Sequence, residues 1–304
     1  MISRRHFIQM ASVATTARFI VPGIAQDSVL DSTSGKRVLC SITYNIRGCQ
    51  GSQDVDADPN LVRIARLQMP KRISLELALY EPDIVTFQEA PDESIVAQIA
   101  EQLNMNYIFF PGGKFFPGSK CCSGALLTHW TILEYRNCPL INYSKRPDEL
   151  FTRHWGRALL DTPFGKLAVY SAHLWPYEKG NEGREVTEII NVIQTDIKNN
   201  QSLIFQGDLN HTPTSDEYIR WQNAGLSDVF ATCGTGIQFT SPNALIHPAP
   251  KERIDYIWAY GPITSMIDQC RVLFERAFRS HHEDSLSFSL SDHLPVMATF
   301  IEKN

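Results

Sequence analysis

Residues 203–213 read LIFQGDLNHTP, a short apolar run that ends in glycine and is followed by an acid and an amide two positions apart. If the strand continues through Leu209, side chains alternate between its two faces, so Asp208 and Asn210 point to the same side. A carboxylate beside an amide at the end of a strand can hold an attacking water and a substrate oxygen together. The same residues also suit a strand followed by an Asx turn, because Asp and Asn favour turns. This stretch alone leaves both interpretations open.

Five other segments offer similar side chains: Asn45, Glu89, His173, Asp255, and Asp292 with His293. Each has an ordinary explanation by itself, such as a turn cap or a satisfied core histidine. A carboxylate inside an apolar run, however, must be paired or hydrogen-bonded. Across all six segments acids and amides outnumber histidines, which suits a hard cation that takes oxygen ligands and keeps several waters. The set therefore predicts a site for Mg²⁺ or Mn²⁺.

The apolar pattern predicts many short strands, a few helices and one domain. Strands are expected over residues 38–46, 84–89, 125–128, 132–135, 157–161, 167–174 and 296–301. Helices are expected over residues 71–80, 92–103, 181–198 and 215–223. Residues 104–125 suggest a strand and an aromatic, glycine-rich surface loop, and residues around 233–236 suggest another loop. Strands at both ends of the chain predict an α/β (α+β) fold of two packed sheets with helices outside.

The composition is that of a globular enzyme, with 43% hydrophobic and 20% charged residues in 304. The formal net charge is -5; without the three arginines of residues 1–25 it becomes 25 basic against 33 acidic residues, or -8. Strong non-specific binding to nucleic acids draws on clustered Lys and Arg, so this balance disfavours it without excluding a local basic groove. The seven cysteines show no zinc-site spacing, and Cys40 is expected in the core.

Residues 1–25 predict an export signal. The segment SRRHFI at residues 3–8 resembles a twin-arginine signal, and an Ala- and Thr-rich apolar stretch follows it. Gly23 and Ala25 are the small residues that a signal peptidase needs. No later run reaches the ~20 apolar residues of a membrane span. We therefore expect export by the twin-arginine machinery to the periplasm or beyond, with no transmembrane anchor.

Six short motifs occur in one order along the chain: YNIR (44–47), QE (88–89), AHL (172–174), GDLN (207–210), IDYI (254–257) and SDHLP (291–295). Together they resemble the endonuclease/exonuclease/phosphatase superfamily, which includes deoxyribonuclease I, exonuclease III-type nucleases, neutral sphingomyelinases and inositol polyphosphate 5-phosphatases. The resemblance implies a four-layer α/β sandwich over residues 36–304, with the site at one end of the sheets. It also implies that Glu89 is the principal metal ligand, that Asn45 supports it, and that Asp292 lies beside the metal.

The resemblance further implies five catalytic residues. Asp208 orients or deprotonates the attacking water, and Asn210 contacts the phosphate or that water. His293 is held by Asp255 and donates to, or stabilises, the pentacovalent phosphorane, while His173 contacts the scissile phosphate. These roles fit phosphoryl transfer, which needs charge neutralisation, an aligned water and help for the leaving oxygen.

Substrate identity is less well specified by the sequence. Arg157 resembles a basic residue near the pocket in family members, and it either contacts substrate or pairs with a carboxylate. We interpret the chain as an exported phosphodiesterase that uses in-line attack of water on a phosphoester of a lipid head group or a nucleic acid. A metal-dependent nuclease is the alternative, which the acidic balance disfavours. A binding module without catalysis would lack metal or water-positioning residues, and none is missing.

Overall fold

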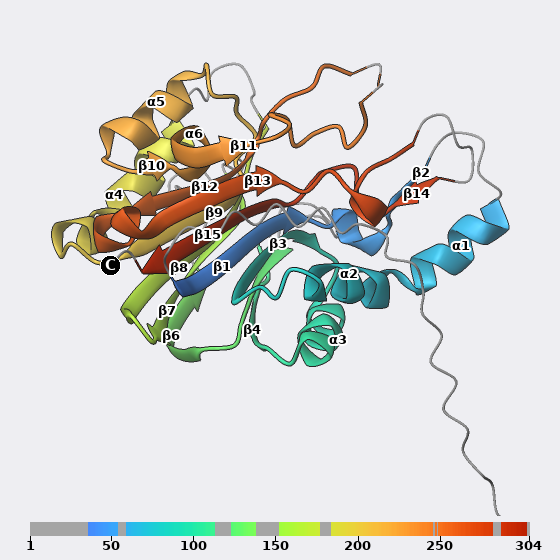
Figure 1. The fold of residues 1–304 in the computed structure, drawn as a ribbon, viewed down its shortest axis with the longest axis horizontal. Helices are drawn as coiled ribbons and strands as arrows, with labels where there is room; N and C mark the ends of the chain where they lie inside the picture. Colours follow the sequence, from blue (N-terminus) through green and yellow to red (C-terminus); the bar gives the residue numbers. More distant parts are fainter. Residues whose placement is uncertain are drawn as a thin grey trace, which may run out of the picture. The chain divides into compact units, whose positions relative to one another are not determined.

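Seven strands form the larger of the two sheets at the centre of the fold (Figure 1). The computed structural model describes residues 36–53, 59–112, 123–137, 152–176, 184–245, 247, 249–281 and 287–302, so the expected signal peptide lies outside it. Strands β1 and β3 pair in parallel at the centre of this sheet. In spatial order the strands are β11 (Gly234–Thr235), β13 (Ile267–Val272), β15 (Val296–Glu302), β1 (Lys36–Asn45), β3 (Ile84–Ala90), β5 (Ser123–Thr128) and β4 (Asn106–Phe110).

Six strands form the second sheet, in which β8 and β9 are parallel neighbours and β12 runs antiparallel to β9. In spatial order they are β10 (Ser227–Asp228), β12 (Asp255–Tyr260), β9 (Leu203–Asp208), β8 (Gly165–Leu174), β7 (Thr152–Thr162) and β6 (Thr131–Asn137). A separate short pair joins β14 (Phe288–Ser289) to β2 (Ser52–Gln53). The two large sheets pack face to face, and the residues of the second sheet that face the larger one include Val169 and Ile204.

Helices lie outside both sheets and complete the four layers (Figure 1). On the larger sheet, α3 (Glu93–Leu103) packs on β3 and β4, and α2 (Met69–Ala78) packs against α3. On the second sheet, α4 (Arg184–Lys198) buries Ile189 and Ile193 against Tyr170 and Phe205. Helix α5 (Asp216–Asn223) adds Trp221, whose ring centroid lies 4.7 Å from that of Phe205. The predicted two-sheet sandwich with outer helices is confirmed.

The expected helices and long strands lie where the pattern predicts them, and Cys40 is buried as expected. Two helices were not predicted: α1 (Pro59–Leu67) and α6 (Val229–Cys233). The loop expected around 233–236 is wrong, because α6 ends at Cys233 and β11 (Gly234–Thr235) pairs with β13. Helix α6 starts after Asp228, which accepts hydrogen bonds from the backbone N–H groups of Phe230 and Ala231. Short 3₁₀ helices occur at Arg47–Cys49, Gly261–Met266 and Arg276–Phe278. Among the described residues, no helix is both long and apolar enough to cross a membrane.

A layer of buried polar side chains joins the two sheets beneath the site. The side-chain amide of Gln206 on β9 donates to Thr86 Oγ1 at 3.0 Å, and its oxygen accepts from Ser41 Oγ at 2.7 Å. Thr86 in turn donates to Thr43 Oγ1 at 3.0 Å, which also accepts from Gln88 at 3.1 Å. Leaving one of these groups unpaired in the core would cost about 1–3 kcal/mol. The network therefore fixes how β9 lies against β1 and β3.

Candidate active site

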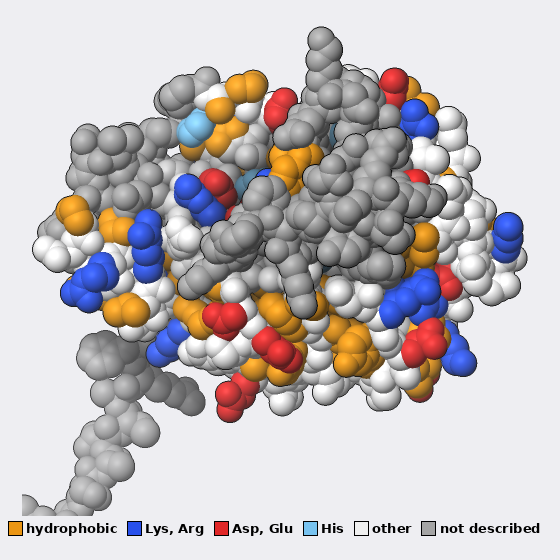
Figure 2. All heavy atoms as spheres, turned by 180° about the vertical axis from the view of Figure 1, so that it is seen from behind, with side chains coloured by type: hydrophobic (Ala, Val, Ile, Leu, Met, Phe, Trp, Pro, Cys, Tyr) orange, Lys and Arg blue, Asp and Glu red, His pale blue; other side chains and the backbone are white. Residues whose placement is uncertain are grey.

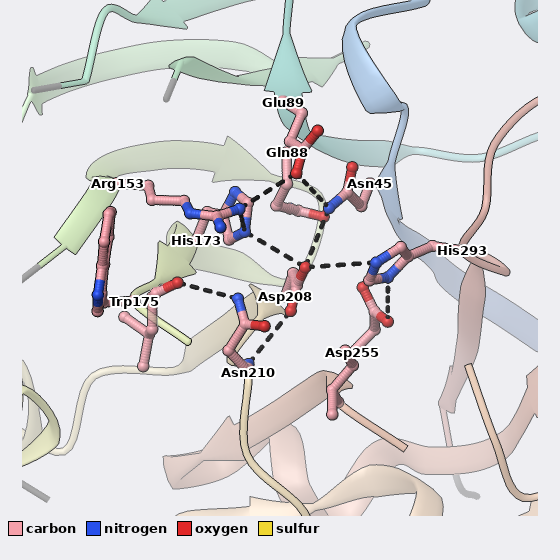
Figure 3. Close-up of polar contacts among 12 residues, drawn as sticks. Asn45, Gln88, Glu89, Arg153, His173, Trp175, Asp208, Asn210, Asp255 and His293 are labelled. Atoms are coloured by element: carbon pink, nitrogen blue, oxygen red, sulfur yellow. Dashed lines mark hydrogen bonds and ion pairs between the residues drawn. The ribbon is translucent and has the colours of Figure 1, made fainter. Parts of the chain in front are cut away.

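The site lies where strands of both sheets end side by side, and it gathers all six segments with polar side chains (Figure 3). Asn45 ends β1 opposite Gln88 of β3, so Glu89 follows directly beside it. In the other sheet His173 near the end of β8 pairs in register with Asp208 at the end of β9, and Asp208 pairs with Asp255 at the start of β12. Parallel and antiparallel pairing of these strands thus brings together residues that are far apart in sequence.

Asp208 is the centre of this arrangement. Its Oδ2 accepts a hydrogen bond from Asn45 Nδ2 at 3.0 Å, and it lies 3.3 Å from His173 Nε2 and 3.8 Å from His293 Nε2. Its Oδ1 accepts from the backbone N–H of Asn210 at 3.1 Å. Burial alone would raise the pKa of Asp208, but the two imidazoles and the hydrogen bonds hold that pKa well below its usual range. Asp208 is therefore ionised throughout the neutral pH range.

His293 forms a buried pair with Asp255, and its Nδ1 lies 2.9 Å from Asp255 Oδ2. Asp255 is itself held by its backbone N–H, which donates to Thr240 Oγ1 at 3.1 Å. Burial would lower the pKa of His293, but the charges of Asp255 and Asp208 outweigh it and raise the pKa to about 10. At neutral pH the imidazole is therefore a cation that donates from Nδ1 to Asp255 and turns Nε2 towards Asp208.

Glu89 provides a carboxylate on the opposite side of the site from the His293–Asp255 pair (Figure 3). Its Oε1 lies 3.4 Å from Asn45 Nδ2 and 3.2 Å from an Arg153 nitrogen. Glu89 has a backbone φ of 54°, a left-handed conformation that costs a non-glycine residue roughly 1–2 kcal/mol. Such strain is tolerated mainly at functional sites, where the surrounding structure fixes it.

The oxygen donors around Glu89 fit a hard divalent cation. Glu89 and the side-chain oxygen of Asn45 are donors of the kind that Mg²⁺ prefers, and Asp292, another carboxylate of the predicted set, is partly exposed and lies 3.3 Å from Arg47 Nε. Asp208, Asp255 and His293 also bring possible ligand atoms within 4.8 Å of one another. A protonated His293 would repel a cation there, whereas the Glu89 side of the site is farther from that charge.

Comparison with known proteins accords with this geometry. The sequence profile of the Endonuclease/Exonuclease/phosphatase family matches residues 42–293, a span that includes every site residue from Asn45 to His293. The chain belongs to the endonuclease/exonuclease/phosphatase family. Members of this family are phosphoester hydrolases that generally depend on a divalent metal, and the chain is a hydrolase of this general kind. No curated protein matches the chain.

Solved structures of other family proteins share the fold. A mannosyl-6-phosphatase from Bacteroides thetaiotaomicron superposes with a TM-score of 0.65 at 21% identity, over 87% of this chain and 100% of that one. A family protein from Leptotrichia buccalis gives 0.62 at 16% identity over 87% and 100% of the two chains. Truncated TDP2 from Caenorhabditis elegans gives 0.60 at 17% identity over 87% and 97%. At these identities the likeness shows the sandwich fold and leaves the substrate open.

The expectation that Arg157 contacts substrate is wrong, and its alternative, pairing with a carboxylate, is what the structure shows. Its Nε and Nη2 donate to the two oxygens of Asp196 on α4 at 2.8 and 2.9 Å, and Nη1 donates to Glu134 at 2.5 Å. Tyr170 also donates to Asp196, at 2.7 Å. Strand alternation turns Arg157 towards the outer helix α4, where its positive charge pairs with Asp196 and Glu134.

Arg153 and Trp175 belong to the site, although the sequence analysis did not identify them. Arg153 Nη1 lies 2.8 Å from His173 Nε2, and its guanidinium lies 5.6 Å from the centre of the Trp175 ring (Figure 3). An isolated Arg in a strand and a Trp after one carry no recognisable signal. The pairing of β7 with β8, which sets His154 opposite His173, is what brings Arg153 to the site.

Proposed function

We propose that this chain is a divalent-metal-dependent phosphodiesterase in which water attacks phosphorus in line with the departing alcohol oxygen. The observation that carries the proposal is Asp208, a buried and ionised carboxylate held between Asn45, His173 and His293. Its low pKa makes it a weak base but a fixed acceptor for one water. Phosphoryl transfer depends chiefly on positioning and electrostatic stabilisation, so alignment of the water is the role that suits Asp208.

His293 supports departure of the alcohol on this proposal. A cationic imidazole can stabilise the charge that develops on phosphate oxygens, and its Nε2 proton can pass to the leaving oxygen. In the net reaction an O–P bond forms to water, the P–O bond to the alcohol breaks, and the alcohol leaves protonated. The proton that the attacking water loses, passed on through Asp208 or solvent, replaces the one that His293 gives up, and Asp255 stabilises the recharged imidazolium at 2.9 Å.

Glu89, with Asp292 and Asn45 beside it, would hold the cation. When bound, a divalent metal supplies neutralisation of the phosphate charge that eases attack by water. Arg153 supplies a second positive charge from the protein itself. Its planar guanidinium can bind two phosphate oxygens at once, an arrangement that Lys cannot reproduce.

The contacts of His173 suggest how Arg153 is released to the substrate. His173 Nε2 lies 2.8 Å from Arg153 Nη1 and 3.3 Å from Asp208 Oδ2. One ring nitrogen can accept from Arg153 or donate to Asp208, but it cannot do both at once. Donation to Asp208 therefore leaves the guanidinium available for a phosphate oxygen.

Nuclease activity remains the second candidate function. The face shown in Figure 2 carries both Lys and Arg and Asp and Glu side chains in the described part of the chain. The formal net charge of -5 also disfavours binding to the polyanionic nucleic-acid backbone. A duplex-binding groove would instead gather positive charge along one surface. A non-catalytic binding module is disfavoured by the complete set of Glu89, Asp208 and His293.

The test is a substrate panel on the chain without residues 1–25, assayed with Mg²⁺, with Mn²⁺ and with EDTA. We expect bis-p-nitrophenyl phosphate to be hydrolysed with metal, and EDTA to lower the rate roughly 100-fold or more because the phosphate charge is then not neutralised. The panel also includes p-nitrophenyl phosphate, sphingomyelin, RNA, and single- and double-stranded DNA.

Arg153→Lys should raise KM more than it lowers kcat, because Lys keeps the positive charge but cannot bind two phosphate oxygens at once.

Other outcomes would redirect the assignment. Selective cleavage of polynucleotides would make the chain a nuclease, and cleavage of the monoester alone would make it a phosphatase. EDTA-resistant hydrolysis would contradict the metal requirement. Failure to hydrolyse every compound, with folded protein and metal present, would favour the binding module.

We also propose that the enzyme is exported through the twin-arginine pathway, on the strength of the SRRHFI segment. The precursor carrying Arg4→Lys and Arg5→Lys should accumulate inside the cell, because both arginines form the recognised signal. Cell fractionation with an antibody to the enzyme measures this. An unchanged yield outside the cytoplasm would contradict twin-arginine export.

A further inference from the structure

A pocket of ≈ 380 Å³ lies beside the catalytic residues, outside the carboxyl ends of β8 and β9. Its wall combines apolar side chains, among them Trp175 and Ile254, with the acids Glu185, Glu217 and Glu252. The volume falls within the range of sites that hold small organic groups. The proposed reaction does not require this pocket, because residues at the strand ends would bind the attacking water and the phosphate.

Two residues connect the pocket to the site. Asn210 lines the pocket, and its backbone N–H donates to Asp208 while its side-chain amide donates to the Leu174 carbonyl at 3.0 Å. Trp175 also lines the pocket, and its ring lies 5.6 Å from the Arg153 guanidinium (Figure 3). A substituent on a phosphate held by Arg153 and Asn210 would therefore enter this pocket.

The wall is acidic. Among its described residues there are three glutamates and neither Lys nor Arg. Glu185 is buried, only 7% exposed, and both its oxygens face the backbone N–H of Trp175, at 3.2 and 3.4 Å. Burial raises the pKa of Glu185 well above its usual range, and that hydrogen bond and the charge of Arg153 offset this only in part. Burial thus favours the protonated form of Glu185, and a cationic group bound beside it would favour the carboxylate, so this wall favours a ligand that brings a positive charge.

Helix geometry explains part of this acidity but not all of it. Glu185 and Glu217 lie in the first turns of α4 and α5, where the helix dipole favours a carboxylate. Glu252 forms an isolated β-bridge with Ser241 before β12 and lies at no helix N-terminus, so the helix dipole does not account for its acidity. The three carboxylates line one cavity, which is also lined by Asn210, the residue whose backbone N–H donates to Asp208.

We propose that this pocket binds a positively charged, ammonium-bearing substituent of the substrate phosphodiester, with Glu185 as its main counter-charge. The proposal rests on the function proposed above and narrows its substrate class. A cation gains from the carboxylates and from the aromatic wall, whereas an anionic substituent such as a second phosphate is repelled.

The experiment compares three phosphodiesters that share p-nitrophenol as the leaving group. Their second arms are choline, the isosteric but neutral 3,3-dimethylbutyl group, and an anionic sulfoethyl group. We expect kcat/KM for the choline ester to exceed that for the neutral isostere by about tenfold or more, as for one charge-assisted contact. The anionic ester should be the poorest substrate.

Glu185→Gln should bring the choline-to-isostere ratio close to one, since Gln can still accept from Trp175 but carries no charge. Glu101→Gln, the same change on an exposed position of α3, should leave the ratio unaltered. Calorimetry with tetramethylammonium supplies a readout without hydrolysis, and its affinity should fall in Glu185→Gln.

The outcomes separate the two proposals. Equal hydrolysis of the choline and neutral esters, or a ratio that survives Glu185→Gln, would overturn the assignment of the pocket while leaving the phosphodiesterase intact. If no ester is hydrolysed but tetramethylammonium binds in a Glu185-dependent way, the proposed function fails and the cation preference of the pocket stands.

Discussion

Asp208→Asn is expected to lower kcat on bis-p-nitrophenyl phosphate roughly 10²- to 10⁴-fold, the range for loss of a positioned group that handles the nucleophile. Asparagine keeps the shape of the side chain and can still accept from Asn45. It loses the negative charge that faces His173 and His293 at 3.3 and 3.8 Å. The loss should therefore appear in kcat, measured at saturating substrate and metal, with little change in KM.

A matched control distinguishes this effect from a general loss of structure. Asp161→Asn makes the same substitution at an exposed position of β7, where surface changes usually alter stability by about 0.5 kcal/mol or less. It should retain full activity, and both variants should melt cooperatively. If folded Asp208→Asn kept a tenth or more of the activity, Asp208 would not be the group that aligns the water.

The strand ends of the candidate site were predictable because each places a polar residue at the end of a run that must be buried. Asp208 and Asn210 follow an apolar run, and His173 ends another. Parallel pairing of β8 with β9 then sets His173 beside Asp208 without further information. What the pattern does not reveal is the inward-facing polar layer, since Gln206 and Gln88 occur inside runs that otherwise indicate an apolar core.

Arg153 and Arg157 show why side-chain roles are harder to predict than strand positions. They are four residues apart on β7, so a regular strand would turn both to the same face. Arg157 keeps that orientation and pairs with Asp196. A register shift between Thr152 and His154 interrupts the pairing next to Arg153, and bulges of this kind re-aim side chains near active sites. That irregularity depends on the partner strand, which the local sequence does not specify.

The second large loss is expected at His293. His293→Gln should lower kcat roughly 10²- to 10³-fold, as for removal of one preorganised donor to developing negative charge. If His293 Nε2 protonates the leaving oxygen, the loss of kcat in His293→Gln should be larger for an ester with an alkyl leaving group than for the p-nitrophenyl ester. An alkoxide departs poorly without a proton, whereas p-nitrophenolate does not need one. An equal loss for both esters would instead assign His293 to stabilisation of the phosphorane.

Asp255→Asn tests the same residue through pH. In the wild-type enzyme His293 is protonated below its pKa of about 10, so activity that needs the cation should persist at neutral pH and fall as pH rises through that value. Burial lowers the pKa of His293, and the charge of Asp255 is the largest contribution that raises it. Removing that charge therefore lowers the pKa of His293. The alkaline limb of kcat should therefore move to lower pH at the same metal concentration.

The two substitutions should also fail to add. Because Asp255 acts through His293 at 2.9 Å, introducing Asp255→Asn into His293→Gln should change kcat far less than it does in the wild-type background. Circular dichroism melts of all three variants exclude unfolding as the cause. Full additivity, or an alkaline limb that does not move in Asp255→Asn, would show that Asp255 serves the fold and not the charge of His293.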